Sequence, residues 1–272
     1  MDLERLPQSV LINDTAEHRV LAVRYAERQT STDEAYFRNS VYGEADRDFT
    51  MAYFFWIIQG TEGTFLFDTG FSSGAAERRA RTFLVDPMDA LSELGIAPTS
   101  VDGVFLSHLH FDHTGHASGF PNAQVYVDTK EYEFWINGNG RKRLLAASAE
   151  EEDLSGLVSL QKSGQLTLLD GTTDVLPGII SIRVGGHTPG QHVLSVNTAG
   201  GPLLLASDAL HYYDEMELDR PFCLFTELDD MYSGYELMRA FETTGARVVA
   251  GHDMAVIDRF GSEENLPYLT AL

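Results

Sequence analysis

The chain has 272 residues, 43% of them hydrophobic, which is enough to bury the core of one large domain. Asp and Glu number 41 against 19 Lys and Arg, so the formal net charge is −22. A surface of this charge repels a phosphate backbone, and nucleic acid is therefore not an expected partner.

The single cysteine, Cys223, excludes an internal disulfide and a cysteine-rich zinc site. Any transition-metal site must therefore use histidine and carboxylate ligands. The N-terminal residues 1–7 carry neither the basic start nor the apolar run of a signal peptide. The longest apolar stretch, 51–58, is too short to cross a bilayer, so we expect a cytoplasmic protein with no membrane partner.

The first half of the chain is predicted to consist of strands followed by short helices. The segment 51–58 is continuously apolar and aromatic, which is typical of a strand covered on both faces, and residues 27–48 form a polar connection before it. Residue patterns predict strands at 18–25, 51–58, 64–68, 101–106 and 125–127, and helices at 86–94 and from about Lys130.

Residues 138–165 are glycine-rich at first and then strongly charged, with four acidic residues in a row at 150–153. A solvated helix over the sheet and a lid over an active site explain this composition equally well.

The second half repeats the order of strands followed by a helix. The patterns predict further strands at 166–169, 179–184, 192–196, 203–206 and 247–250, and a helix at 232–244. Two such rounds, with ligand-type residues at strand ends, predict an α/β (α+β) protein. Its four layers would form an αββα sandwich, as a single domain over 1–272 with the site along one edge.

A histidine-rich motif follows the predicted strand 101–106 directly. Four ligand-type side chains lie within the six residues 108–113. In an extended segment, positions 108, 110 and 112 share one side, and a turn after Phe111 would aim Asp112 and His113 at a neighbouring point. This density of ligand types predicts a loop that serves two metal ions.

Three later residues complete the predicted metal site, and each lies at a strand end. They are His187, Asp208 and His252, and glycines beside both histidines allow sharp turns. The predicted ligands are His108, His110, Asp112, His113, His187, Asp208 and His252. Their nitrogen and oxygen donors suit zinc, iron, cobalt or manganese without choosing among them. His18, His116 and His192 are predicted to be satisfied or exposed histidines outside the site.

The order of these motifs resembles the metallo-β-lactamase superfamily over roughly residues 50–255. The motifs are H-x-H-x-D-H at 108–113, Asp68-Thr69-Gly70, the turn 187–190, Asp208 and Gly251-His252. Within the superfamily, the stretch 107–115 resembles the N-acyl-homoserine lactonase group. The same loop also occurs in 4-pyridoxolactonase-like and glyoxalase-II-like relatives.

The resemblance implies a role for each ligand. His108, His110 and His187 would hold one divalent ion, Asp112, His113 and His252 would hold the other, and Asp208 would bridge both. Zinc is the expected metal. The implied enzyme is a dinuclear hydrolase that opens a lactone ring, as of an N-acyl-homoserine lactone in quorum quenching, with metal-bound hydroxide. Asp112 would pass a proton to the leaving group. Lactonases of this group are often homodimers.

One position departs from the lactonase pattern. Lactonases of this group place a tyrosine three residues after the bridging aspartate to stabilise the oxyanion, and here that residue is His211. Either His211 replaces the phenol, or Tyr212 reaches in after a small loop shift. Tyr212 is preferred here, with His211 as the rival, and both are candidate catalytic residues. The alternative is that they only line the cleft.

Two other functions remain open. Another lactone or ester hydrolase, or a glyoxalase-II-like thioester hydrolase, would use the same fold; the thioester enzyme would carry cationic side chains for glutathione. Arg141, Lys142 and Arg143 are candidates, although a solvated basic turn explains them equally well. A metal-binding protein without activity is the second alternative.

Overall fold

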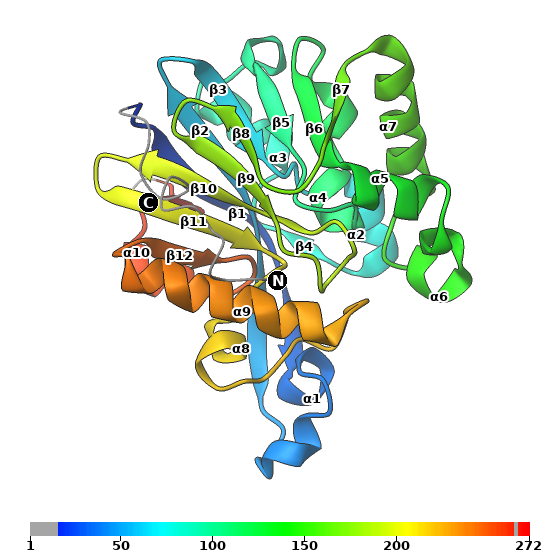
Figure 1. The fold of residues 1–272 in the computed structure, drawn as a ribbon, viewed down its shortest axis with the longest axis vertical. Helices are drawn as coiled ribbons and strands as arrows, with labels where there is room; N and C mark the ends of the chain where they lie inside the picture. Colours follow the sequence, from blue (N-terminus) through cyan, green and yellow to red (C-terminus); the bar gives the residue numbers. More distant parts are fainter. Residues whose placement is uncertain (1–15, 264–265) are drawn as a thin grey trace.

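The structure is a computed structural model that describes residues 16–263 and 266–272, and it contains two packed β-sheets (Figure 1). The first sheet has the order β13-β1-β2-β3-β5-β6-β7, with β4 paired to β1. Its strands are β1 (Arg19–Ser31), β2 (Asp48–Gly60), β3 (Gly63–Phe67), β4 (Thr82–Phe83), β5 (Gly103–Phe105), β6 (Gln124–Asp128), β7 (Leu166–Leu169) and β13 (Leu269–Ala271). From β3 to β7 the neighbouring strands are parallel, and the others are antiparallel.

The second sheet has the order β12-β11-β10-β9-β8. Its strands are β8 (Thr173–Leu176), β9 (Ile179–Arg183), β10 (His192–Thr198), β11 (Gly201–Ser207) and β12 (Arg247–Ala250). Only β11 and β12 pair in parallel among these described strands. Residue patterns had predicted all of these strands except β4, β8 and β13.

Helices cover the outer faces of the two sheets. Figure 1 shows α9 beside β12 on one side of the sandwich and α5 and α7 beside β6 and β7 on the other. The helices are α1 (Thr32–Ala35), α2 (Ser73–Arg79), α3 (Pro87–Glu93), α4 (Phe111–Thr114), α5 (Thr129–Ile136), α6 (Arg143–Ala146), α7 (Glu151–Ser163), α8 (Tyr213–Glu217), α9 (Leu228–Thr243) and α10 (Ala255–Phe260). Short 3₁₀ turns are η3 (Asn39–Tyr42), η4 (Pro98–Ser100), η5 (Ala117–Gly119) and η6 (Asn139–Arg141). The αββα prediction is confirmed.

The polar connection predicted at 27–48 is wrong at both ends. β1 continues to Ser31 and β2 begins at Asp48, and the two residues are paired directly. A register shift between Arg24 and Ala26 marks a bulge in β1. The polar composition of this part hid the strand, because backbone pairing with β2 stabilises it without an apolar alternation.

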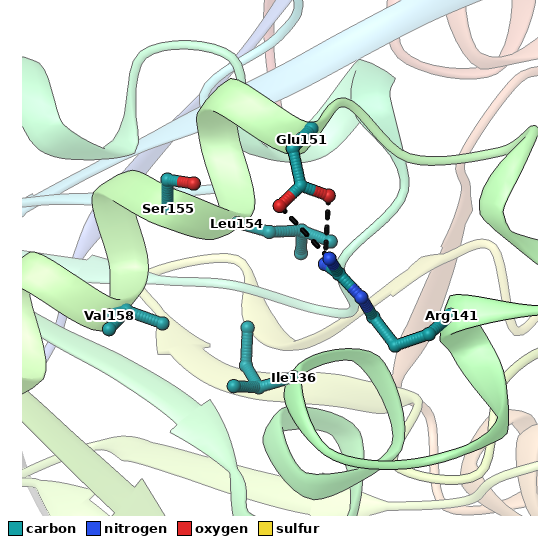
Figure 2. A pocket seen from close by; sticks show the side chains of 6 residues that line it. All are labelled: Ile136, Arg141, Glu151, Leu154, Ser155 and Val158. Carbon is teal, nitrogen blue, oxygen red and sulfur yellow. Dashed lines mark hydrogen bonds and ion pairs between the residues drawn. The ribbon is translucent and has the colours of Figure 1, made fainter.

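The charged segment 138–165 forms a helix packed on the first sheet. Leu154, Leu157 and Leu160 of α7 are buried, and the acidic row at the start of the helix lies where the helix dipole favours negative charge. Arg141 pairs with Glu151, with 2.8 Å between Nη1 and Oε2, and both side chains line a pocket of about 170 Å³. Figure 2 shows this pair among the residues that line the pocket. The helix over the sheet, one of the two alternatives for this segment, is present, and the lid over the active site stays a prediction.

Two of the expectations concern the N-terminal residues and membrane-spanning segments. The N-terminal residues 1–7 lie outside the described residues. Within 16–263 and 266–272, no helix is long and apolar enough to cross a membrane.

The two sheets meet along the edge where the predicted ligands lie. His192 N–H of β10 donates to Ser107 O after β5, at 2.8 Å, and Ala52 N–H of β2 donates to His252 O after β12, at 3.0 Å. Gly190 N–H donates to Glu131 Oε2 at the start of α5, at 2.9 Å. These bonds join loops of one sheet to elements of the other.

Gly190 has no space for a side chain at this junction. A Cβ there would lie 2.4 Å from Glu131 N, which is backbone and cannot move aside easily. We expect Gly190→Ala to lower the free energy of unfolding by about 1–3 kcal/mol, measured in urea. The control is Gly119→Ala, whose nearest atom would be Met88 Cε at 3.8 Å and whose effect should stay within about 0.5 kcal/mol. Equal effects of the two changes would contradict the tight junction.

Candidate metal centre

The structure brings all seven predicted ligands together in two groups. One group is His108, His110, His187 and Asp208, and the other is Asp112, His113 and His252. Within each group the candidate ligand atoms lie within 4.8 Å of one another, and every member is buried. They come from the segments that follow β5, β9, β11 and β12, and Asp112 and His113 lie in the short helix α4 after β5.

The Asp208 carboxylate lies between the two groups. Its Oδ2 is 3.3 Å from His187 Nε2 and 3.7 Å from His108 Nε2. Its Oδ1 is 2.9 Å from His252 Nε2 and 3.1 Å from His113 Nε2. Each oxygen therefore faces the imidazoles of a different group, which is the arrangement that a bridging ligand needs.

Several imidazole rings are oriented by a hydrogen bond at the nitrogen that faces away from the centre. His187 Nδ1 pairs with Leu224 O at 2.8 Å, and His252 Nδ1 pairs with Ala52 O at 2.6 Å. Because a carbonyl only accepts, Nδ1 carries the hydrogen and the Nε2 lone pair is free to bind a metal. His110 instead turns Nδ1 inward, 2.9 Å from His187 Nε2.

Asp68 is the carboxylate that holds His113. Its Oδ2 lies 2.7 Å from His113 Nδ1 and also accepts hydrogen bonds from Ser107 Oγ and Ser207 Oγ, both at 2.9 Å. The residue has a left-handed backbone with φ +62°, which directs this side chain under the ligand loop. Burial disfavours a charged His113, but Asp208 and Asp68 outweigh it and raise its pKa well above the ordinary value.

The donor set fits a pair of metal ions. His108 Nε2 and His113 Nε2 are buried and have no hydrogen-bond partner, so both atoms face the centre unsatisfied. Burial lowers the pKa of His108 and His187 well below the ordinary value and that of His110 to about 3, which keeps these rings neutral. Metals bind neutral imidazoles. Metal ions would supply the missing partners.

His211 and Tyr212 lie in different surroundings. His211 Nε2 is 3.1 Å from Asp208 Oδ2, and its ring lies 4.7 Å from that of His187, although His211 belongs to neither ligand group. Burial opposes charging of this ring, but Asp208 and a second carboxylate, Glu215, raise the pKa of His211 to about 9. Tyr212 packs against Phe49, and its buried hydroxyl has no hydrogen-bond partner.

The remaining three histidines lie outside both ligand groups and have partners elsewhere. His18 Nε2 pairs with Pro177 O at 2.9 Å, and His116 Nε2 pairs with Phe71 O at 3.2 Å. His192 Nε2 pairs with Asp128 Oδ2 at 2.9 Å.

Two buried carboxylates of the site had no role in the sequence prediction. Asp68 was recognised only as part of a motif, and Glu131 was not singled out. Glu131 Oε1 accepts from Leu109 N–H at 3.0 Å and Oε2 accepts from Gly190 N–H at 2.9 Å, so it ties the two ligand loops together. Burial raises its pKa to about 7. An acidic residue in an amphipathic helix carries no sequence signal for such a role.

The bond from Asp68 to His113 leads to a test of metal affinity. Asp68→Asn keeps the shape but replaces a charged acceptor, so we expect metal affinity to fall by about 10- to 100-fold. Competition with a chromophoric chelator measures it. The control, Asp170→Asn, changes an exposed carboxylate that pairs with Arg183. Unchanged affinity in Asp68→Asn would contradict the role of Asp68.

Comparisons with known proteins agree with this site. The chain is 34% identical over 173 residues to N-acyl homoserine lactonase AttM of Azorhizobium caulinodans, covering 59% of this chain and 61% of that protein. It is 33% identical over 186 residues to AttM of Rhizobium johnstonii, covering 64% of this chain and 66% of that protein. The matched regions thus span less than two thirds of these relatives. A Bacillus sp N-acyl homoserine lactonase is 27% identical, with 73% and 80% covered.

Solved structures share the fold at low sequence identity. A quorum-quenching N-acyl homoserine lactone lactonase has a TM-score of 0.75 at 21% identity, covering 89% of this chain and 95% of that one. An N-acyl homoserine lactone hydrolase with N-hexanoyl-L-homoserine bound at its catalytic metal center has a TM-score of 0.74 at 20% identity, covering 90% and 96%. The model of the metallo-beta-lactamase superfamily matches residues 46–265. Fold, ligand order and family model agree, and the chain belongs to the metallo-beta-lactamase superfamily.

Proposed function

We propose that the protein is a dinuclear-metal hydrolase that opens the ring of N-acyl-homoserine lactones. The observation that carries the proposal is the Asp208 carboxylate, whose two oxygens face two separate groups of ligand atoms. The relatives described above, which carry the name N-acyl homoserine lactonase, support the choice of a lactone as substrate. Hydrolysis adds one water to the ester bond and yields an N-acyl homoserine.

The seven residues of the site form one ligand set for each of two metal ions. His108, His110 and His187 would hold one ion, and Asp112, His113 and His252 the other, with Asp208 contacting both. When bound, two divalent ions supply activation of water near neutral pH and polarisation of the ester carbonyl. Zinc is the metal that we propose, with iron, cobalt and manganese as alternatives that the same donors suit. A cytoplasmic location and a homodimer are further parts of the proposal.

Asp112 is the proposed proton donor to the leaving group. Its carboxylate lies 3.7 Å from His113 Nε2 at the edge of the second group, and its backbone carbonyl accepts from Tyr25 O–H at 2.9 Å. This bond holds the main chain at Asp112 in place. Ring opening leaves an alkoxide that must gain a proton, and the attacking water must lose one. The Asp112 carboxylate can accept the proton from that water and pass it to the alkoxide.

His211 is the proposed donor to the carbonyl oxygen of the substrate. Its Nε2 edge lies beside Asp208 and the ring of His187, whereas Tyr212 is surrounded by the aromatic rings of Tyr36 and Phe49. The position of His211 therefore supports it over Tyr212, which the sequence had favoured. A donor aimed at a developing oxyanion stabilises the transition state.

A glyoxalase-II-like thioester hydrolase receives little support from the basic turn 141–143. Arg141 already forms an ion pair with Glu151, so a carboxylate of the protein balances its positive charge (Figure 2).

Substrate class is tested with metal-loaded protein and a panel of N-acyl-homoserine lactones, simple lactones and a glutathione thioester. We expect N-acyl-homoserine lactones to gain the mass of one water, as measured by mass spectrometry. Asp112→Asn should lower kcat by about 10²- to 10⁴-fold, because the amide can neither accept nor pass on the proton. Metal content is measured for this variant too, since Asp112 is also a proposed ligand. Turnover of the thioester but of none of the lactones would contradict the lactonase proposal.

The two donor candidates can be separated by substitution. We expect His211→Asn to lower kcat by about 10²- to 10³-fold while metal content stays unchanged. Tyr212→Phe removes only the unpartnered hydroxyl and should leave kcat within about threefold, since that hydroxyl has no role in the proposal. The reverse order of effects would transfer the role to Tyr212.

A further inference from the structure

Glu215 of α8 is a buried carboxylate held by three donors of the protein. It is fully buried, and its Oε1 accepts from Tyr212 N–H at 2.8 Å. Its Oε2 accepts from Tyr235 O–H at 2.7 Å and from Phe222 N–H at 3.4 Å. Among residues 16–263 and 266–272, no lysine or arginine forms an ion pair with it. A carboxylate with this environment has a fixed position.

The His211 ring is the only imidazole that Glu215 contacts in the described chain. His211 Nδ1 lies 3.3 Å from Glu215 Oε1, and the opposite nitrogen, Nε2, lies 3.1 Å from Asp208 Oδ2. The ring is stacked on Phe222, with ring centres 3.6 Å apart and 19° between the planes. Stacking fixes the plane of the ring, and the two carboxylates lie at its opposite edges.

A carboxylate behind a histidine decides which nitrogen faces the reaction. In serine hydrolases, the buried aspartate holds the imidazole in one tautomer and orientation, and its loss disables the histidine without removing it. Glu215 stands in the same place behind His211, because its Oε1 lies at the Nδ1 edge of the ring and Nε2 lies at the metal centre. To donate from Nε2 as well as from Nδ1, the ring must carry a hydrogen on both nitrogens, and a carboxylate at each edge favours that form. Neither sheet supplies this contact; it depends on α8.

We propose that Glu215 is the positioning residue for His211, fixing the ring so that Nε2 faces Asp208 and the carbonyl oxygen of the bound lactone. This inference rests on the proposed function, in which His211 is the donor to the oxyanion. Glu215 contacts none of the seven metal ligands, so its role is exerted through His211 and not through the metals.

The first test compares two neighbouring glutamates of α8. Glu215→Gln keeps an oxygen for Tyr212 N–H and His211 Nδ1 and turns its amide toward Tyr235, whose hydroxyl can rotate to accept. The long contact of 3.4 Å from Phe222 N–H is lost in this variant. The amide is a weaker acceptor than the carboxylate, so we expect kcat to fall by about 10- to 100-fold with unchanged KM and metal content. The control is Glu217→Gln, a surface partner of Arg259, which should leave kcat unchanged.

A double-mutant cycle asks whether Glu215 acts through His211. His211→Asn retains a donor where Nδ1 lies and removes Nε2. If the proposal is correct, Glu215→Gln lowers kcat in the wild type but not further in the His211→Asn background. Equal fold-losses in both backgrounds would show that Glu215 supports the fold alone and would overturn the proposal. If Glu215→Gln does not fold, Glu215→Asp, which withdraws the carboxylate from Nδ1, takes its place in the cycle.

A readout without turnover separates this inference from the proposed function. Long-range ¹H–¹⁵N spectra of zinc-loaded protein identify the His211 signals by their loss in His211→Asn. We expect a proton on Nδ1 in the wild type and a changed Nδ1 signal in Glu215→Gln but not in Glu217→Gln. An unchanged Nδ1 signal in Glu215→Gln would overturn the positioning role. If the wild type opens no lactone, the proposed function fails, and these spectra still decide whether Glu215 holds the ring.

Discussion

The buried carboxylate of Asp208 is the interaction on which the rest of the structure depends. A carboxylate without solvent is costly unless charges or hydrogen bonds compensate it. Burial alone would raise the pKa of Asp208, but the surrounding histidines, with His113 and His252 foremost, lower it well below the ordinary value. Those histidines come from loops of both sheets. The contact between the two sheets at this edge is therefore what compensates the buried charge of Asp208.

The residues behind the ligands hold this edge in place. Asp68 fastens the loop after β5 to β11 through Ser107 and Ser207, and it orients His113 at the same time. On the other side, the first turn of α5 presents Glu131 to both ligand loops. Each of these carboxylates satisfies backbone or hydroxyl donors that would otherwise be buried without partners. Rigid support of this kind keeps ligand atoms within the short distances that metals require.

The surroundings of His211 show how one position can change while the metal groups stay complete. The residue stacks on Phe222 and lies between Asp208 and Glu215, so its ring is confined on a face and at two edges. Glu215 places a carboxylate at the Nδ1 edge of this imidazole. Glu215 lies on the short helix α8, whose N-cap residue Tyr212 follows His211 directly, so the two groups are also close along the chain.

The sequence by itself determined the superfamily, the two rounds of strands and the seven ligand-type residues. It could do so because 108–113 is a dense local motif and because strand ends are visible in residue patterns. Only the tertiary structure decided the full length of β1, the role of Asp68 and the contact between Glu215 and His211. The length of β1 depends on a partner elsewhere in the chain, because pairing with β2 stabilises it. The contact of His211 with the centre depends on the course of the turn after Asp208, which decides whether His211 or Tyr212 lies beside that carboxylate. Local sequence carries no record of such contacts.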